Sequence, residues 1–358
     1  MRDFTDFTNW VHEALIGILP AGVASIVEMI LIATVFLIFF AVMGLILVYV
    51  ERKIAGFFQL RLGPNRVGPW GMFQTAADAL KLVMKEPVGT KEADSLLYNL
   101  APYFLIVTAL MALSVIPYGF GMHAYDIDIG IFFIVAVSSI GVIGILLAGW
   151  GSNNKYALVA AMRSGAQIVS YELSVGLSLL TMVLLTGSLQ MSEIVQSQEH
   201  LWLIFQGHIP ALIAFVIFII SGTAESNRVP FDLVEAESEL GAGFHSEYSG
   251  IKFAFFFLSE FVNMFIMTAM ATVVFLGGWM PFHIPGLDGF NHIMDYIPSV
   301  FWFFGKVSFL IFLIMWFRWT FPRLRIDQVL TLEWKYLLPI NLVNILVMAF
   351  LVLMGWVF

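Results

Sequence analysis

The chain has 358 residues, of which 60% are hydrophobic and 12% are charged, and its formal net charge is −8. This composition lies far outside that of soluble domains and predicts a polytopic membrane protein. The sequence contains no Cys, which excludes iron–sulfur clusters, thiolate-bound haem, disulfides and the common cysteine zinc sites within this chain. The negative charge and the scattered basic residues argue against nucleic acid as a partner.

The N-terminal segment has acidic residues ahead of a short apolar core and no clear small-residue cleavage site. It is therefore a poor match to a cleaved signal peptide. We expect residues 1–25 to form a surface segment with a short helix, and residues 26–358 to form a single membrane domain.

Eight apolar stretches are long enough to cross a bilayer core, which requires about 20 helical residues. They cover roughly residues 26–50, 98–118, 129–150, 156–186, 201–220, 253–279, 298–319 and 336–358. The fourth and the sixth are longer than a perpendicular crossing needs, so we expect them to tilt or to project from the membrane. The predicted fold class is an all-α, polytopic integral membrane protein with eight transmembrane helices and long cytoplasmic loops.

The basic residues indicate the orientation of these spans, because Lys and Arg are retained on the cytoplasmic side. All of them except Arg2 and Lys306 lie in or beside the segments that follow odd-numbered spans. We therefore expect both termini on the outer side and the long loops on the cytoplasmic side, or on the matrix side in an organelle.

Residues 72–85, which follow the first span, form an amphipathic pattern. The side chains of Gln74, Asp78, Lys81 and Lys85 fall within about 60° of one another at helical spacing, and apolar residues cover the other side. This pattern predicts an amphipathic helix in the membrane interface. Packing of the apolar side against a partner protein is the alternative.

Two glutamates lie inside predicted spans. Glu172 is about 24 Å along the fourth span, near bilayer mid-depth, and Glu260 lies in the sixth. A carboxylate at such a position costs about 2.5 to 3.5 kcal/mol, so it usually faces a cavity or a charge partner and often marks an ion route. We interpret both as proton relays; a buried ion pair that only fixes helix packing is the alternative. Lys306, in the seventh span, could be such a partner or could reach toward the interface.

The stretch Ser221–Ser249 between the fifth and sixth spans is unusually acidic. Pro230 can open a short helix there, and Gly241 and Gly243 can end it. Carboxylates on so short a helix form a proton reservoir if they are enclosed, and a solvated acidic loop if they are open. The acidic residues are Glu225, Asp232, Glu235, Glu237, Glu239 and Glu247.

Common catalytic and metal-binding motifs are missing from the sequence. It has no phosphate-binding GxxxxGK[ST], no HExxH and no nucleophile elbow. The His residues are scattered, several of them in or near the outer loops, so we expect no bound metal.

The ordered motifs of the chain resemble those of the H-subunit family, called subunit 1 in mitochondria, of the proton-pumping NADH:quinone oxidoreductases, respiratory complex I. The likeness covers nearly all of the chain after about residue 25. The motifs are ERK at 51–53, QLRLGPNRVGP at 59–69, ADALKLVMKE at 77–86, GWGSNNKYAL at 149–158, AAMRSGAQIVSYE at 160–172, AESNRVPFDLVEAESEL at 224–240, EYSG at 247–250 and RWTFPRLRIDQ at 318–328.

The resemblance implies roles for particular residues. The quinone chamber of the family corresponds here to Arg52, Arg61, Tyr171 and Asp232, with Phe257 nearby. Its proton relay corresponds to Glu172, Glu225, Asp232, Glu235, Glu237, Glu239 and Glu260, and the charges would be balanced by Arg163 and Arg228. Phe261 departs from the family pattern, in which Tyr often follows the Glu, and this puts a hydrogen bond from that position to quinone in doubt.

The resemblance also implies a function: a translocase subunit of the respiratory chain that forms the quinone-binding chamber and couples quinone reduction to proton translocation. Quinone, either ubiquinone or menaquinone, would be its substrate. It would have no redox centre of its own, no covalently bound cofactor and no metal, because a partner subunit supplies the terminal iron–sulfur cluster. The expected partners are the soluble-arm subunits, the small membrane subunits next to the antiporter-like chain, and lipid.

The expected location is the bacterial inner membrane, with both termini periplasmic, in preference to the mitochondrial inner membrane. Three other functions stay open. The chain could be the membrane subunit of an energy-converting hydrogenase, a secondary ion transporter that acts alone, or a purely structural anchor for the soluble arm.

Overall fold

The computed structural model describes residues 5–18, 20–199, 201–233, 241, 243–283 and 288–356. Eight helices within these residues are long and apolar enough to cross a membrane, and the described residues contain no strand. The predicted all-α fold class with eight spans is therefore confirmed. The expected positions of Glu235, Glu237 and Glu239 lie outside the described residues.

The membrane-crossing helices are connected by short helices and turns. The spans are α2 (Ala21–Phe58), α4 (Ser95–Val115), α5 (Gly130–Gly151), α6 (Lys155–Thr186), α9 (His208–Glu225), α11 (Ile251–Phe275), α13 (Ser299–Thr320), and a final span composed of α14 (Ile326–Thr331), a π-helical turn (Leu332–Leu337) and α15 (Leu338–Leu353). The shorter helices are α1 (Thr5–Ile18), α3 (Gln74–Met84), α7 (Met191–Gln196), α8 (Leu203–Gln206) and α12 (Asp288–Asp295), with 3₁₀ turns at Pro69–Gly71 and Gly243–His245.

Three spans differ most from the sequence-based prediction. The first span continues to Phe58, so that the ERK motif lies on the helix. The fifth begins at His208, because the chain turns at Gly207 after α8, and it ends at Glu225. The last begins at Ile326, ahead of the expected position near residue 336. The hydropathy of the sequence predicted a later start because Glu333 is an acidic residue, although its side chain is fully buried in the fold.

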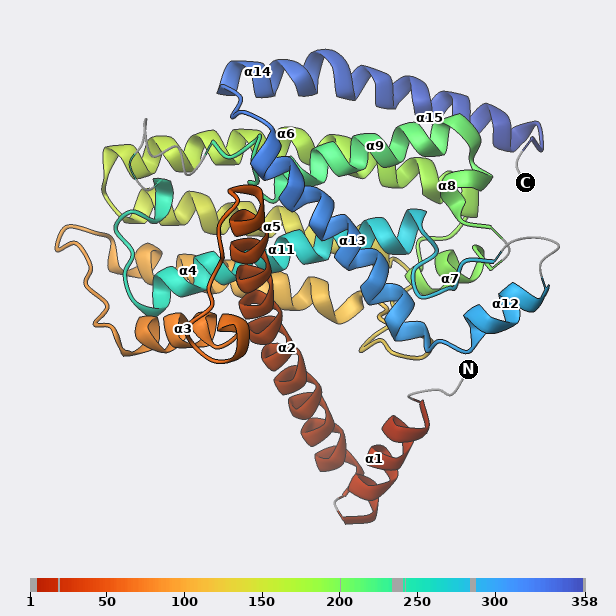
Figure 1. The fold of residues 1–358 in the computed structure, drawn as a ribbon, viewed down its shortest axis with the longest axis horizontal. Coiled ribbons are helices and arrows are strands. Elements are labelled where there is room, and N and C mark those ends of the chain that lie inside the picture. Colours follow the sequence, from red (N-terminus) through yellow and green to blue (C-terminus); the bar gives the residue numbers. More distant parts are fainter. Residues whose placement is uncertain are drawn as a thin grey trace.

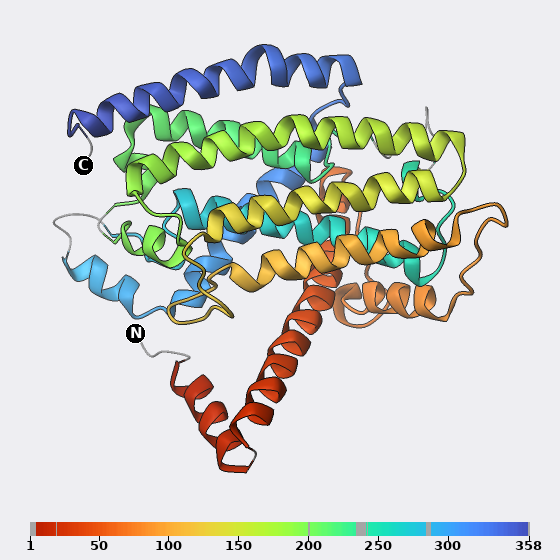
Figure 2. The same ribbon diagram turned by 180° about the vertical axis from the view of Figure 1, so that it is seen from behind.

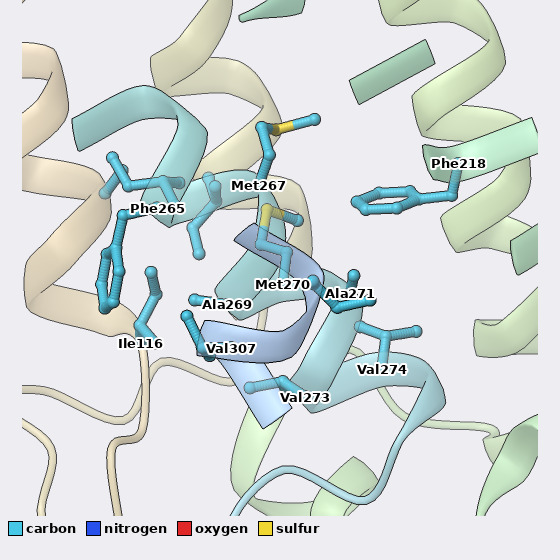
Figure 3. Close-up of a cluster of buried hydrophobic side chains, with 14 of the residues drawn as sticks. Ile116, Phe218, Phe265, Met267, Ala269, Met270, Ala271, Val273, Val274 and Val307 are labelled. Carbon is cyan, nitrogen blue, oxygen red and sulfur yellow. The ribbon is translucent and has the colours of Figure 1, made fainter. Parts of the chain in front are cut away.

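The helix α11 forms the centre of the bundle. In its most apolar stretch 67% of residues are buried, compared with 17% for α2. Figure 3 shows Phe265, Met270 and Val273 of α11 among side chains from other elements, including Phe218 of α9 and Val307 of α13. By contrast, α2 crosses the other helices at a steep angle, and its N-terminal half projects from the bundle with α1 folded back toward it (Figure 1).

One face of the bundle is a layer of successive helices. Figure 2 shows α4, α5, α6 and α15 following one another across this face. Two of these helices begin at side-chain caps: Asp94 accepts from the Leu96 amide at 3.0 Å, and Asn154 accepts from the Tyr156 amide at 2.9 Å. Close packing of α5 on α6 requires Gly149, because an added Cβ would lie 2.3 Å from Cβ of Ala161.

Short elements gather at the two ends of the bundle. The amphipathic segment is α3, which lies at the end where α4 and α6 begin, whereas α7, α8 and α12 lie at the other end (Figure 1). The apolar side chains of Leu80, Val83 and Met84 on α3 are exposed. At the opposite end, Lys306 of α13 donates to the carbonyl oxygens of Leu276 at 2.6 Å, Gly278 at 3.1 Å and Met280 at 2.7 Å. Lys306 therefore caps the C-terminal end of α11.

Candidate functional site

A buried cluster of alternating charges connects α2, α11, α13 and the turn after α9. Arg228 Nη1 lies 3.0 Å from Glu51 Oε2, and Arg228 Nε lies 3.3 Å from Glu260 Oε1. Arg318 donates to the other oxygen of Glu51. The guanidinium of Arg228 also lies over the ring of Phe261, 4.1 Å from its centroid. The cluster therefore holds two carboxylates between two arginines, and Phe261 supplies a cation–π contact at the position where the hydrogen bond was in doubt.

A cavity of about 40 Å³, lined by both apolar and polar side chains, lies beside this cluster. Because a buried water needs only about 10–15 Å³ of such space and a few polar partners, the cavity can hold a small number of waters. Two carboxyl groups that the sequence analysis selected separately therefore share one hydratable space. Its lining includes Glu225, Asn227, His245, Phe257, Glu260 and Asn263.

A second cavity, of about 60 Å³, continues from the first. Glu225, Asn227 and Asn263 line both, and Ser138 of α5 lines the second. The Glu225 carboxyl is within interaction range of Ser138 and of Glu172. The carboxyls of Glu260, Glu225 and Glu172 therefore form a series across the interior.

Glu172 ends this series on α6. Its carboxylate accepts a hydrogen bond from the hydroxyl of Ser139 on α5, and its side chain is half-buried. Arg163, on the same helix, is also half-buried and lies about 13 Å toward the N-terminus by helical rise.

Asp232 lies where the chain leaves the turn after α9. Its side chain is buried, and its Oδ2 is 3.4 Å from Arg323 Nη2. The backbone of this loop is tied to the segment before α14, since the Leu324 amide donates to the Pro230 carbonyl at 3.1 Å. His245 lies within electrostatic reach of Asp232; burial lowers its pKa to about 4, and the Asp232 carboxylate only partly offsets this effect. The imidazole is consequently neutral at neutral pH.

The other expected chamber residues lie apart from the cavities. Arg52 lies 2.5 Å from Asp78 of α3, and the Nε of Arg61 donates to Gln59 at 2.6 Å; both arginines are exposed. Burial raises the pKa of Asp78, but the hydrogen bond and the charge of Arg52 more than offset it, so that this pKa lies below its usual value.

Tyr171 is fully buried, and its ring packs against Phe231 with 5.3 Å between centroids. Its hydroxyl donates to the Val329 carbonyl at 2.9 Å. The structure therefore brings Phe257, Glu225 and Glu260 together, but it does not bring Tyr171 to them.

Sequence reasoning missed several residues of this region. Glu51 was not selected because its partners, Arg228 and Arg318, come from distant segments, and His245 was treated as one of the scattered His residues. Glu333, in the π-helical turn of the last span, is fully buried and accepts a hydrogen bond from the hydroxyl of Ser174 on α6. Asn341 supports the same contact by donating to the Ser174 carbonyl at 2.9 Å. The available signal was an acidic residue at the edge of an apolar run, which Glu51 follows and Glu333 precedes.

Among the described residues, no three or more His, Asp or Glu side chains are grouped so that they could hold a metal ion. The chemistry available in the interior is therefore proton exchange between carboxyl, imidazole and hydroxyl groups, next to a set of fixed guanidinium charges.

Comparison with known proteins gives consistent results. A family model described as NADH dehydrogenase matches residues 30–349. The chain is 58% identical over 355 residues to the H subunit of NADH-quinone oxidoreductase from Bacteroides fragilis (strain ATCC 25285), with 99% of each chain covered. It is 56% identical over 358 residues to the protein of the same name from Bacteroides thetaiotaomicron, covering all of both chains. It is 48% identical over 303 residues to the protein of the same name from Rhodospirillum centenum, and the match covers 85% of this chain and 87% of the relative.

Proposed function

The chain belongs to the NADH dehydrogenase family as a membrane subunit of complex I, and from this premise we propose that it forms part of the quinone chamber and couples quinone reduction to proton translocation. The observation that carries the proposal is the series of carboxyls from Glu260 through Glu225 to Glu172: Glu260 and Glu225 line one cavity, Glu225 also lines the next, and Glu172 is within electrostatic range of Glu225. Carboxyl groups are costly at membrane depth, and they are typical of proton routes.

The chemistry of quinone supports this role. Reduction of a quinone to a quinol takes up electrons and protons in equal number, and each proton that a carboxyl group of the protein supplies leaves a negative charge on that group. The protons would come from the carboxyl series, which is then refilled from the far end at Glu172. Since this chain has no Cys, the electrons would come from an iron–sulfur cluster of a partner subunit, and quinone is the substrate rather than a resident group.

The charge cluster supplies a way to transmit the change. Arg228 is shared between Glu51 and Glu260. A proton gained or lost at Glu260 therefore changes the electrostatic attraction that holds Arg228 and the turn that carries it. Coupling requires such a difference between two states of one element. The turn after α9 leads directly to Asp232, which would face the quinone side.

The entrance for quinone is proposed between α2, α3 and α11. The exposed apolar side chains of Leu80 and Val83 make α3 suited to the membrane interface, where lipid would contact it. At Gly44, α2 comes so close to α11 that an added Cβ would lie 2.4 Å from Leu258. Arg52 and Arg61, at the same end, would line the approach.

Membership in complex I implies other complex I subunits as partners, and we propose which surfaces meet them. The end with α3 and most of the basic loops would face the cytoplasm and the soluble-arm subunits. The lateral faces would contact the small membrane subunits next to the antiporter-like chain. Both termini would then be periplasmic in a bacterial inner membrane.

The substitution Glu225→Gln in the assembled complex tests the proposal. It removes the titratable proton and keeps the size of the side chain, so we expect at least about a tenfold loss of quinone reductase rate and fewer protons moved per electron in membrane vesicles. Glu193→Gln, at an exposed position on α7, is the matched control and should keep both values. An unchanged proton yield in Glu225→Gln would contradict the relay. Proton flux catalysed by the purified chain alone in liposomes would favour a secondary transporter instead.

A further inference from the structure

His245 occupies the junction between the buried Asp232 and the first cavity. The 3₁₀ turn Gly243–His245 carries the imidazole into the lining of the cavity that contains Glu225 and Glu260. On its other side, the ring is within electrostatic reach of Asp232. No other titratable side chain in the described lining of this cavity comes from the loop between α9 and α11.

The packing around His245 fixes its ring. Phe244 meets it edge to face with 5.1 Å between centroids, and Phe253 does so at 5.4 Å. These two rings restrict the rotation of the imidazole, which lines a hydratable space and interacts electrostatically with Asp232.

The charged groups around His245 come from several elements. Asp232 faces it from the same loop, Glu225 from the end of α9, and Glu260 from α11. The two nearby arginines are engaged with carboxylates: Arg228 lies 3.3 Å from Glu260, and Arg323 lies 3.4 Å from Asp232.

A neutral imidazole is suited to proton transfer because one ring nitrogen is a donor and the other is an acceptor. It can accept a proton on one nitrogen from a cavity water and release the proton of the other nitrogen toward Asp232. One proton enters and one leaves, no electron is exchanged, and the reverse exchange restores the tautomer. A cavity of about 40 Å³ has room for the waters that such a step needs.

We propose that His245 is the relay residue that passes protons from the Glu225–Glu260 cavity to Asp232 on the quinone side. This inference rests on the proposed function, and it adds the link between the two acidic groups. Among the described residues of the loop between α9 and α11, His245 is the titratable side chain that lines this cavity, so without it the series from Glu260 and Glu225 would lack a link to Asp232.

The test compares three substitutions at this position in the assembled complex. His245→Phe keeps an aromatic ring among Phe244 and Phe253, His245→Gln keeps hydrogen bonding, and His245→Ala opens a space for added imidazole. We expect all three to lower the quinone reductase rate by at least about tenfold, and imidazole to restore part of the rate in His245→Ala only. NADH oxidation by an artificial acceptor, together with the amount of assembled complex, shows that the variants fold.

The outcomes separate this inference from the proposed function. If His245→Phe keeps the wild-type rate and proton yield while Glu225→Gln loses them, His245 only packs, and the proposed function stands. If neither variant changes the rate or the yield, both proposals are wrong. A loss in His245→Ala that imidazole does not rescue, with full activity in His245→Gln, would also overturn the relay. His283→Phe, at an outer loop where the ring is 3.0 Å from Asp295, is the control and should keep wild-type activity.

Discussion

Two groups of interior carboxyls lie within one bundle and differ in their partners. Glu51 and Glu260 are held by the guanidinium groups of Arg228 and Arg318, which fix both charge and geometry. Glu172 and Glu225 instead have hydroxyl partners, Ser139 and Ser138, and Glu225 opens on two cavities.

A hydroxyl can donate to a carboxylate or accept from a protonated carboxyl, whereas a guanidinium can only donate. The first group therefore favours the ionised form, and a proton that reaches Glu260 would weaken its pair with Arg228, whereas the second group can change its protonation state without such a rearrangement. This difference teaches that the chemical type of the partner, rather than burial alone, decides what a change of protonation does to the surrounding structure.

The largest effect is expected from a substitution that breaks the ion pairs of the first group. Arg228→Met leaves Glu51 and Glu260 without their shared cation, which should cost about 3–5 kcal/mol and reduce the amount of assembled complex in the membrane. Arg52→Met removes an exposed pair and should change stability by only about 0–1 kcal/mol. Thermal unfolding of the solubilised complex compares the two. Equal thermal unfolding midpoints for the two variants would mean that the ion pairs of Arg228 do not stabilise the fold.

The second group should respond in the opposite way. Glu172→Gln keeps an oxygen that accepts from Ser139, so the free energy of unfolding should stay within about 0.5 kcal/mol of wild type. The coupled quinone reductase rate should nevertheless fall by about 100-fold, because the amide cannot exchange a proton. Rates in membrane vesicles, measured beside the unfolding curve, check both parts. A variant that is unstable but coupled would reverse the assignment of the two groups.

A pH titration of stability sharpens the comparison at the junction. The pKa of His245 is lowered from its usual 6.5 to about 4, so the unfolded chain binds more protons than the native one between these values. Stability should therefore fall as pH drops through this window, by about 2 kcal/mol at pH 5 relative to neutral pH. His245→Phe should lack this contribution. If both proteins lose stability equally between pH 7 and pH 5, the imidazole is not held in its neutral form.

Hydropathy was sufficient to find the spans, because a helix in lipid must satisfy its backbone internally and needs a long apolar run. It failed at the start of the last span, where Glu333 looks incompatible with a membrane helix until Ser174 and Asn341 are seen beside it. Polar contacts between helices decide such boundaries. A hydropathy average over one segment of the sequence carries no information about these contacts.

The candidate site was predictable only in part for the same reason. Glu172 and Glu260 stood out as acids inside apolar runs, and the structure adds the cavities that connect Glu260 to Glu225. Glu51 was overlooked because it meets Arg318, 267 positions away in the chain. Tyr171, expected at the chamber by resemblance, donates its hydroxyl to the Val329 carbonyl, a contact that the motif does not reveal. The direction of a side chain depends on its neighbours in space, and the sequence motif does not contain these.

The cap that Lys306 provides has a mechanical consequence. The ammonium group holds the C-terminal end of α11 through three carbonyls, whereas Glu260 lies in the N-terminal half of this helix of 25 residues. The N-terminal end, about 37 Å away by helical rise, has no side-chain cap and is tied to α4 by the hydrogen bond from Lys252 to Asn99. Any displacement that follows a change of charge at Glu260 would therefore be greatest in the N-terminal half, beside α3 and the proposed quinone entrance.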